Sequence, residues 1–197
     1  MITLRTRALR ILDFDTEARP LSWYGGEWVT KEVTAIAAQY VGEKRMYCWA
    51  LGETDSLTML KGFRQLYDAA DIVTGHYIVG YDLPVLNGAM LEFGLPPLEP
   101  KLTQDTKTGL MRFSGLSKSQ ENLGALLGLK HPKIGMNQAT WREANRLTQR
   151  GIRLTKQRVK GDVRQHMELR EELLRRGMLA PPRLWQPKSG YSPAYHA

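Results

Sequence analysis

The sequence contains one cysteine, Cys48, among 197 residues, so neither an internal disulfide nor a cysteine-based zinc cluster can form. No apolar run approaches the length of a membrane span, and the basic N-terminus lacks the uninterrupted apolar segment and cleavage site of a signal peptide. Hydrophobic residues make up 42% of the chain and charged residues 24%, which is typical of a soluble globular protein. The sequence therefore predicts a cytoplasmic protein without a membrane partner.

Acidic residues are scarce in residues 142–164. This segment has two acids, Glu143 and Asp162, and eight basic residues, so its net charge is +6. The eight are Arg142, Arg146, Arg150, Arg153, Lys156, Arg158, Lys160 and Arg164. A run of charge is often only a solvated helix face, but this one contains few acids to balance it. Together with a net charge of +8, it favours contact with phosphate groups, as in a nucleic acid.

Hydrophobic periodicity predicts one α/β domain over residues 1–180. The expected strands are 8–15, 33–41, 45–51, 71–76 and 101–106, of which the second and third form a hairpin. The expected helices are 56–70, 81–94, 117–128, 137–150 and 154–176. This order predicts a mixed sheet of about five strands with helices on both faces, a three-layer architecture. Residues 181–197, rich in proline, serine and aromatics, are expected to be an extended or partly disordered tail.

Four acids stand where an acid is locally unfavourable. Asp15 and Glu17 share one face at the end of an apolar strand, Asp82 begins a helix, and Asp162 borders the apolar stripe of the last helix. Clustered carboxylates repel one another unless cations neutralise them, and hard oxygen ligands select Mg²⁺ or Mn²⁺. Two such ions about 3.5–4 Å apart serve in-line phosphoryl displacement. Asp13 shares the strand face and is expected to be a structural acid paired with a basic residue.

Four segments resemble, in order, the motifs of the DnaQ-like (DEDD) 3′-to-5′ exonucleases of the ribonuclease-H-like superfamily: LDFDTEA, VTGHYIVGYDLPVL, DTKTGLMRFSGLSKSQENLGALLGLKHPK and VKGDV. The resemblance covers roughly residues 8–178. It implies a ribonuclease-H-like fold with Asp15, Glu17, Asp82 and Asp162 as catalytic ligands of two Mg²⁺ or Mn²⁺ ions. It also implies hydrolysis of the terminal phosphodiester at a 3′ end, releasing nucleoside monophosphates. Compact members of this kind occur in phages, which suggests a role in phage or bacterial DNA replication or repair.

The chain departs from this family at the residue that orients or deprotonates the attacking water. The family has a Tyr four residues, or a His five residues, before the last Asp, whereas this chain has Arg158 and Gln157, neither of which is a base at neutral pH. Three interpretations stay open: a metal-acidified water reacts without a side-chain base, His166 or His76 replaces the base, or the site binds without cleaving. For both histidines a structural role is the preferred interpretation. Arg158 is expected to contact the scissile phosphate or to pair with the carboxylates.

The expected partner is a nucleic acid, DNA rather than RNA, held by a single-stranded 3′ end. Trp23 and Tyr24 follow the first motif and form a candidate stacking platform for the terminal base, although packing onto the core is equally compatible with them. Tyr77 replaces an Asn that is frequent in the family. Further expected nucleic-acid contacts are Arg158, Lys160 and Lys130. Two functions compete with an exonuclease: a weakly active or inactive nucleic-acid-binding module, and a related endonuclease or resolvase. The tail is a candidate protein-binding segment, and the oligomeric state is left open.

Overall fold

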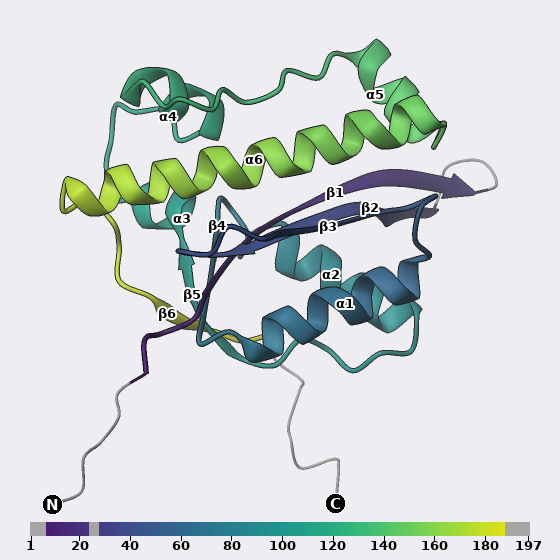
Figure 1. The fold of residues 1–197 in the computed structure, drawn as a ribbon, viewed down its shortest axis with the longest axis horizontal. Helices are drawn as coiled ribbons and strands as arrows, with labels where there is room; N and C mark the ends of the chain where they lie inside the picture. Colours follow the sequence, from purple (N-terminus) through teal and green to yellow (C-terminus); the bar gives the residue numbers. More distant parts are fainter. Residues whose placement is uncertain (1–6, 24–27, 188–197) are drawn as a thin grey trace, which may run out of the picture.

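The computed structural model describes residues 7–23 and 28–187. Within these residues the elements follow the expected order of three strands, a helix, a strand, a helix, a strand and then helices (Figure 1). The strands are β1 (Ile11–Trp23), β2 (Trp28–Tyr40), β3 (Met46–Ala50), β4 (Ile72–Gly75), β5 (Lys101–Asp105) and β6 (Arg183–Trp185). The helices are α1 (Ser56–Ala69), α2 (Asp82–Glu92), α3 (Thr106–Leu110), α4 (Gln120–Leu127), α5 (Gln138–Asn145) and α6 (Gln149–Arg175).

The strands form one mixed sheet in the order β3-β2-β1-β4-β5-β6. β1, β2 and β3 are antiparallel, which confirms the expected hairpin, and β4 and β5 run parallel to β1. The sheet has six strands rather than about five, because β6 pairs antiparallel with β5 through Lys101↔Trp185. This strand lies in the segment expected to be a tail. It has only three residues, most of them exposed, so it shows no hydrophobic periodicity from which a strand could be predicted. Residues 188–197 of that tail lie outside the described residues.

β1 and β2 extend well beyond the expected 8–15 and 33–41, to 13 residues each. β4 pairs only with Ile11–Asp13 of β1, so the rest of β1 is joined to β2 alone. Pro20 lies in this two-stranded part, which is where a strand tolerates a proline. In the sequence, the polar residues after Asp15 suggest that the buried strand ends there. In the structure, β1 continues through them and stays paired with β2 as far as Trp23. Glu17 belongs to the strand for this reason, just before a register shift between Glu17 and Ala18.

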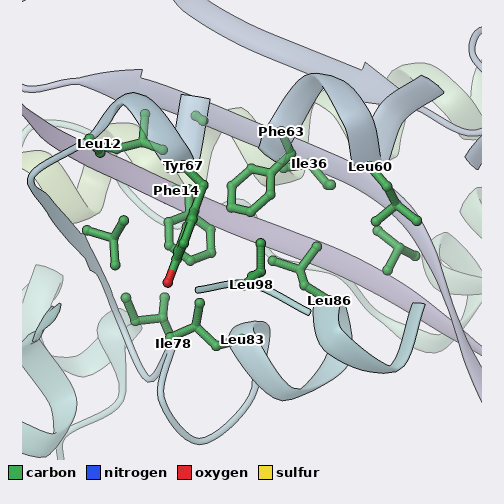
Figure 2. Packing of buried hydrophobic residues seen from close by; sticks show 14 of the residues in the cluster. Leu12, Phe14, Ile36, Leu60, Phe63, Tyr67, Ile78, Leu83, Leu86 and Leu98 are labelled. Carbon is green, nitrogen blue, oxygen red and sulfur yellow. The ribbon is translucent and has the colours of Figure 1, made fainter. Parts of the chain in front are cut away.

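Helices cover both faces of the sheet, α1 and α2 on one side and α6 on the other (Figure 1). The first side holds the larger core, in which Phe14 of β1 packs between the two helices against Phe63 and Leu83 (Figure 2). Even positions of β1, such as Leu12 and Phe14, point into this core. Odd positions, the acids among them, therefore point toward α6.

Small residues on β2 let α6 approach the sheet. Ala35 and Ala37 are fully buried under Ile152, Val159 and Val163 of α6. Ala37 pairs with Asp15, and Ala35 pairs with Glu17. The alanines thus bring α6 close to the same strand positions that carry the acids.

The C-terminal helices divide differently from the expected 137–150 and 154–176. α5 ends at Asn145, and α6 begins at Gln149 with Thr148 as its N-cap, whose hydroxyl accepts a hydrogen bond from the N–H of Gly151. A Cβ at Gly151 would lie 2.3 Å from the carbonyl oxygen of Glu143, so the corner between the helices requires a glycine. The capping threonine and the close approach at Gly151 therefore end one helix and begin the next within the segment 137–150, which was expected to be a single helix. Among residues 7–23 and 28–187, no helix combines the length and apolar character needed to cross a bilayer.

Candidate metal centre

Three of the four expected acids converge between β1 and α6. Asp15, Glu17 and Asp162 each place one carboxylate oxygen within 4.8 Å of the others. Asp15 and Glu17 alternate on β1 and so point the same way, while Asp162 approaches from α6, where it is only 4% exposed. We call these three residues the carboxylate cluster.

The fourth acid, Asp82, begins α2 and adjoins the cluster. Its Oδ1 accepts hydrogen bonds from the backbone N–H of Thr16 at 2.9 Å and from the Thr16 hydroxyl at 2.6 Å. Thr16 lies between Asp15 and Glu17 on β1, so these bonds fix the start of α2 against the strand that carries the cluster. The negative charge of Asp82 in turn raises the pKa of Asp15.

The cluster concentrates negative charge in a buried place. Burial raises the pKa of Glu17 to about 7 and that of Asp82 to about 6. The pKa of Asp15 is raised well above its usual range, first by burial and then by the charges of Asp82, Asp162 and Glu17. Carboxyl groups this close favour binding a proton or a cation over ionising together.

The donor set fits a hard divalent cation. Every group in the cluster offers carboxylate oxygen, the ligand type that Mg²⁺ and Mn²⁺ prefer. In addition, Asp162 Oδ1 is buried and receives no hydrogen bond from the described residues. A buried acceptor without a donor is unfavourable, and a metal ion at this position would satisfy it.

Two basic side chains contact the cluster. Arg158 Nε donates a hydrogen bond to Glu17 Oε1 at 3.1 Å, and Nη2 forms an ion pair with Asp162 Oδ2 at 3.0 Å. A further hydrogen bond runs from Nη1 to the carbonyl oxygen of Ile134. Lys133 Nζ lies 3.7 Å from Asp162 Oδ2. Of the two roles expected for Arg158, the structure shows the pairing with carboxylates. The part of Lys133 and Ile134 was not predicted, because nothing in the sequence shows that the loop before α5 folds back over α6.

The candidate bases His166 and His76 are engaged elsewhere. His166 is buried, with Nδ1 2.7 Å from Asp13 Oδ2 and Nε2 3.1 Å from the Thr106 hydroxyl. The same hydroxyl lies 2.8 Å from His76 Nδ1, and His76 Nε2 lies 2.8 Å from the carbonyl oxygen of Lys118. The expected pairing of Asp13 with a basic residue is confirmed. The structure places both histidines in this hydrogen-bonded chain rather than in the cluster.

The direction of each hydrogen bond in this chain follows from the proton count. The carbonyl of Lys118 can only accept, so neutral His76 carries its proton on Nε2 and its Nδ1 accepts from the Thr106 hydroxyl. Burial lowers the pKa of His76 to about 3, which keeps it neutral. Because Thr106 has one proton to give, His166 must donate to it, and a second proton is then shared between His166 Nδ1 and Asp13. The chain therefore joins Asp13 of β1, His166 of α6, Thr106 of α3 and His76 in the turn after β4.

The expected nucleic-acid contacts are dispersed. Tyr77, in a left-handed conformation with φ of 73° at the turn after β4, is 41% exposed, and the ammonium group of Lys107 lies 3.8 Å from its ring centroid. Lys160 lies on the β3 side of α6, near Cys48. Burial raises the pKa of the Cys48 thiol, and the charges of Lys156 and Lys160 only partly offset that rise. Lys130 is exposed beside Glu168. Trp23 is described only as the last residue of β1, and Tyr24 lies outside the described residues.

Comparisons with known proteins bear on the fold. No protein-family model and no curated protein sequence matches the chain. Among solved structures the chain is similar to the family B DNA polymerase from the hyperthermophilic archaeon Pyrobaculum calidifontis, with a TM-score of 0.66 and 17% sequence identity. The match covers 85% of this chain and 25% of the polymerase chain, so this protein spans about a quarter of that enzyme. The fold is ribonuclease-H-like, with a mixed sheet of six strands flanked by helices.

Proposed function

We propose that this protein is a metal-dependent 3′-to-5′ exonuclease that hydrolyses the terminal phosphodiester of single-stranded DNA, using two Mg²⁺ or Mn²⁺ ions. The proposal rests above all on the convergence of Asp15, Glu17 and Asp162, with an oxygen of Asp162 buried and without a donor among the described residues. The order of the four sequence motifs supports the DnaQ-like assignment. The likeness to part of a DNA polymerase supports DNA as the substrate.

The residues around the cluster have distinct roles in the proposed reaction. Asp15, Glu17, Asp82 and Asp162 would hold the ions, which when bound acidify a water molecule and stabilise the leaving oxygen. Thr16 positions Asp82 through two hydrogen bonds, and the Asp13–His166 pair positions α6 against β1. Neither histidine has a free ring nitrogen for a proton, so no side-chain base is available from them. We therefore expect slow hydrolysis that accelerates as the pH rises.

Replacement of a cluster residue should abolish nuclease activity. An oligonucleotide labelled at its 5′ end should shorten one nucleotide at a time with Mg²⁺ or Mn²⁺ and stay intact with EDTA. The variant Asp162→Asn should be at least ~100-fold slower, since even groups that only orient metal ligands contribute 10–100-fold. The rate is measured by resolving the products on a denaturing gel.

The matched control is Asp68→Asn, which removes an exposed carboxylate on α1 that pairs with Arg64 at 3.4 Å, away from the cluster. This variant should retain the wild-type rate. Cleavage of a circular single strand would instead show an endonuclease. DNA binding without cleavage under either metal would show a binding module and contradict the proposed activity.

A further inference from the structure

β3 forms one edge of the sheet, and part of its backbone has no partner. The N–H of Leu51, just after β3, donates to the carbonyl oxygen of Thr34 on β2 at 2.8 Å. Hydrogen-bonded pairs alternate along two antiparallel strands, so every second residue before Leu51 bonds to β2. Met46 and Cys48 lie between these residues and direct their N–H and C=O groups away from β2, where the described part of the chain offers them no backbone partner. Such an open edge is a template for a further strand.

A groove of about 600 Å³ runs along this edge, between β3 and α1. On the strand it is lined by Tyr47 and Trp49, whose rings stack with their centroids 6.2 Å apart. Trp49 packs closely on α1 because Gly62 has no side chain: a Cβ there would lie 2.8 Å from Trp49 Cζ2. On α1 the groove is lined by the exposed side chains of Lys61 and Gln65, which are one turn apart. The edge thus combines free main-chain groups with space for the side chains of an added strand.

The charge around this edge is positive. Arg45 and Lys61 line the groove, and no acidic residue does. On the α6 side of β3 lie Lys156, which pairs with Glu53 at 2.5 Å, and Lys160. A strand added to β3 would therefore meet basic side chains on both of its faces. A second copy of this chain would bring the same basic residues to the edge and be repelled, whereas a segment with acidic side chains would be attracted.

An acidic peptide fits the edge better than a nucleic acid does. Tyr47 lies between Arg45, whose guanidinium is 4.5 Å from the ring centroid, and Trp49, so a base has no open face of this ring on which to stack. A peptide also carries the alternating N–H and C=O groups that Met46 and Cys48 can pair with, and a nucleic acid does not.

We propose that the edge of β3 is a docking site for an extended acidic segment of a partner protein, which pairs with β3 as an additional strand. The main chain of the segment exchanges hydrogen bonds with Met46 and Cys48, and its acidic side chains lie beside Arg45 and Lys61. Main-chain bonds supply affinity in this mode of recognition, and side-chain contacts supply selectivity. β3 is separated from β1 by β2, and the site shares no residue with the carboxylate cluster, so the inference goes beyond the proposed nuclease activity and does not depend on it.

Two synthetic octapeptides of equal charge test the pairing. The first alternates acidic residues with valine, and the second has proline in place of each valine, so that it lacks the N–H groups that a sheet requires. In fluorescence anisotropy measured in EDTA, the labelled valine peptide should bind at least ~10-fold more tightly than the proline peptide, because several hydrogen bonds distinguish them. The valine peptide should also slow hydrogen exchange at the amides of Met46 and Cys48, as measured by NMR. The amides of Tyr47 and Trp49, which already bond to β2, should not change.

Three variants locate the site. Lys61→Glu reverses an exposed charge in the groove and should weaken binding of the valine peptide at least ~10-fold. Met46→Pro removes one outward N–H at the first residue of β3, a position that accommodates proline, and should weaken binding roughly 2–10-fold. Arg183→Glu is the control, because it reverses an exposed charge on β6 at the opposite edge of the sheet, and it should bind as the wild type does. Circular dichroism establishes that each variant is folded, and Lys61→Glu with the exchange measurement decides the case if Met46→Pro does not fold.

The opposite results are equally specific. Equal affinity for the two peptides, or no binding of the valine peptide at about 1 mM, would overturn the docking site. Displacement of the peptide by oligothymidylate would overturn it in favour of a nucleic-acid surface. A dimer that sediments as such in the wild type and dissociates in Met46→Pro would show that a second copy occupies the edge. Nuclease activity is measured separately with metal and labelled DNA, so failure of one proposal leaves the other standing.

Discussion

At the scale of single residues, Thr106 links the buried His166 and the half-buried His76 through one hydroxyl group. Its Oγ1 lies 2.8 Å from His76 Nδ1 and 3.1 Å from His166 Nε2. His166 continues to Asp13, which lies on β1 two residues before Asp15. Removal of this hydroxyl would leave a ring nitrogen on each histidine without its partner, and on the His166 side that nitrogen is buried.

The substitution Thr106→Val should therefore destabilise the fold more than the removal of an ordinary hydroxyl. We expect a decrease of roughly 2–4 kcal/mol in the free energy of unfolding, since each buried polar group left without a partner costs about 1–3 kcal/mol. The measurement is urea-induced unfolding followed by circular dichroism. Thr103→Val is the matched control, because the hydroxyl of this buried threonine on β5 donates to the nearby carbonyl of Lys101. Equal decreases for the two variants would show that the histidine chain contributes nothing.

At the scale of elements, α6 serves two purposes on two different faces. One face packs on β2 and presents Asp162 to the cluster. The other carries Arg150, Arg153, Lys160 and Arg164, whose spacings of three, seven and four residues place them in one row. The row spans about 21 Å at 1.5 Å per residue. None of the four pairs with a carboxylate within residues 7–23 and 28–187, whereas Lys156, outside the row, pairs with Glu53 at 2.5 Å.

This row should contribute phosphate contacts in DNA binding. Replacing Arg153 or Arg164 by Gln should weaken binding of single-stranded DNA and reduce the slope of log K against log [salt] by about 0.7 for each phosphate that is no longer neutralised. The measurement is fluorescence anisotropy over a series of salt concentrations, in EDTA so that the DNA stays intact. Arg175→Gln is the control, because Arg175 is exposed on the same helix but already pairs with Glu172 at 2.6 Å. If the slope of log K against log [salt] is unchanged in both Arg153→Gln and Arg164→Gln, the row does not contact phosphates and is only a solvated helix face.

At the scale of the whole molecule, the cluster couples stability to pH and to metal. Glu17 has an ordinary pKa of 4.5 and a folded-state pKa of about 7, raised chiefly by burial. Between these values the folded protein binds more protons than the unfolded chain, so the free energy of unfolding falls as the pH rises. Asp82, whose pKa is raised from 3.8 to about 6, acts in the same direction.

In EDTA, the wild type should therefore become less stable relative to Glu17→Gln between pH 4.5 and pH 7, by an amount on the order of 3 kcal/mol. Added Mn²⁺ should raise the melting temperature of the wild type more at pH 7 than at pH 5, because protons compete with the metal for the carboxylates. Both effects are followed by thermal unfolding across a pH series. A stability difference from Glu17→Gln that stays constant with pH would contradict the raised pKa of Glu17.

Much of the fold was predictable because local signals agree with it. Asp55 caps α1, and the turn between β2 and β3 separates two strands rich in β-branched and aromatic residues. The predicted element boundaries that were wrong share one cause: contacts between distant segments outweighed the local sequence pattern. β1 and β2 extend through polar residues as a two-stranded ribbon, Thr148 starts α6 earlier than the pattern suggests, and β6 forms only because β5 offers an edge.

The sequence alone determined that Asp15 and Glu17 share a face, because side chains in a strand alternate with a period of two. The resemblance to the DnaQ-like exonucleases also predicted that Arg158 stands where that family has its water-orienting residue. Only the tertiary structure decided what Arg158 does, since its partner Glu17 is 141 residues away and Ile134 lies on a loop whose path no local pattern specifies. Contacts between distant segments depend on how all the layers pack together. The same reason explains why the bonds from Thr16 to Asp82, 66 residues apart, became visible only in the folded molecule.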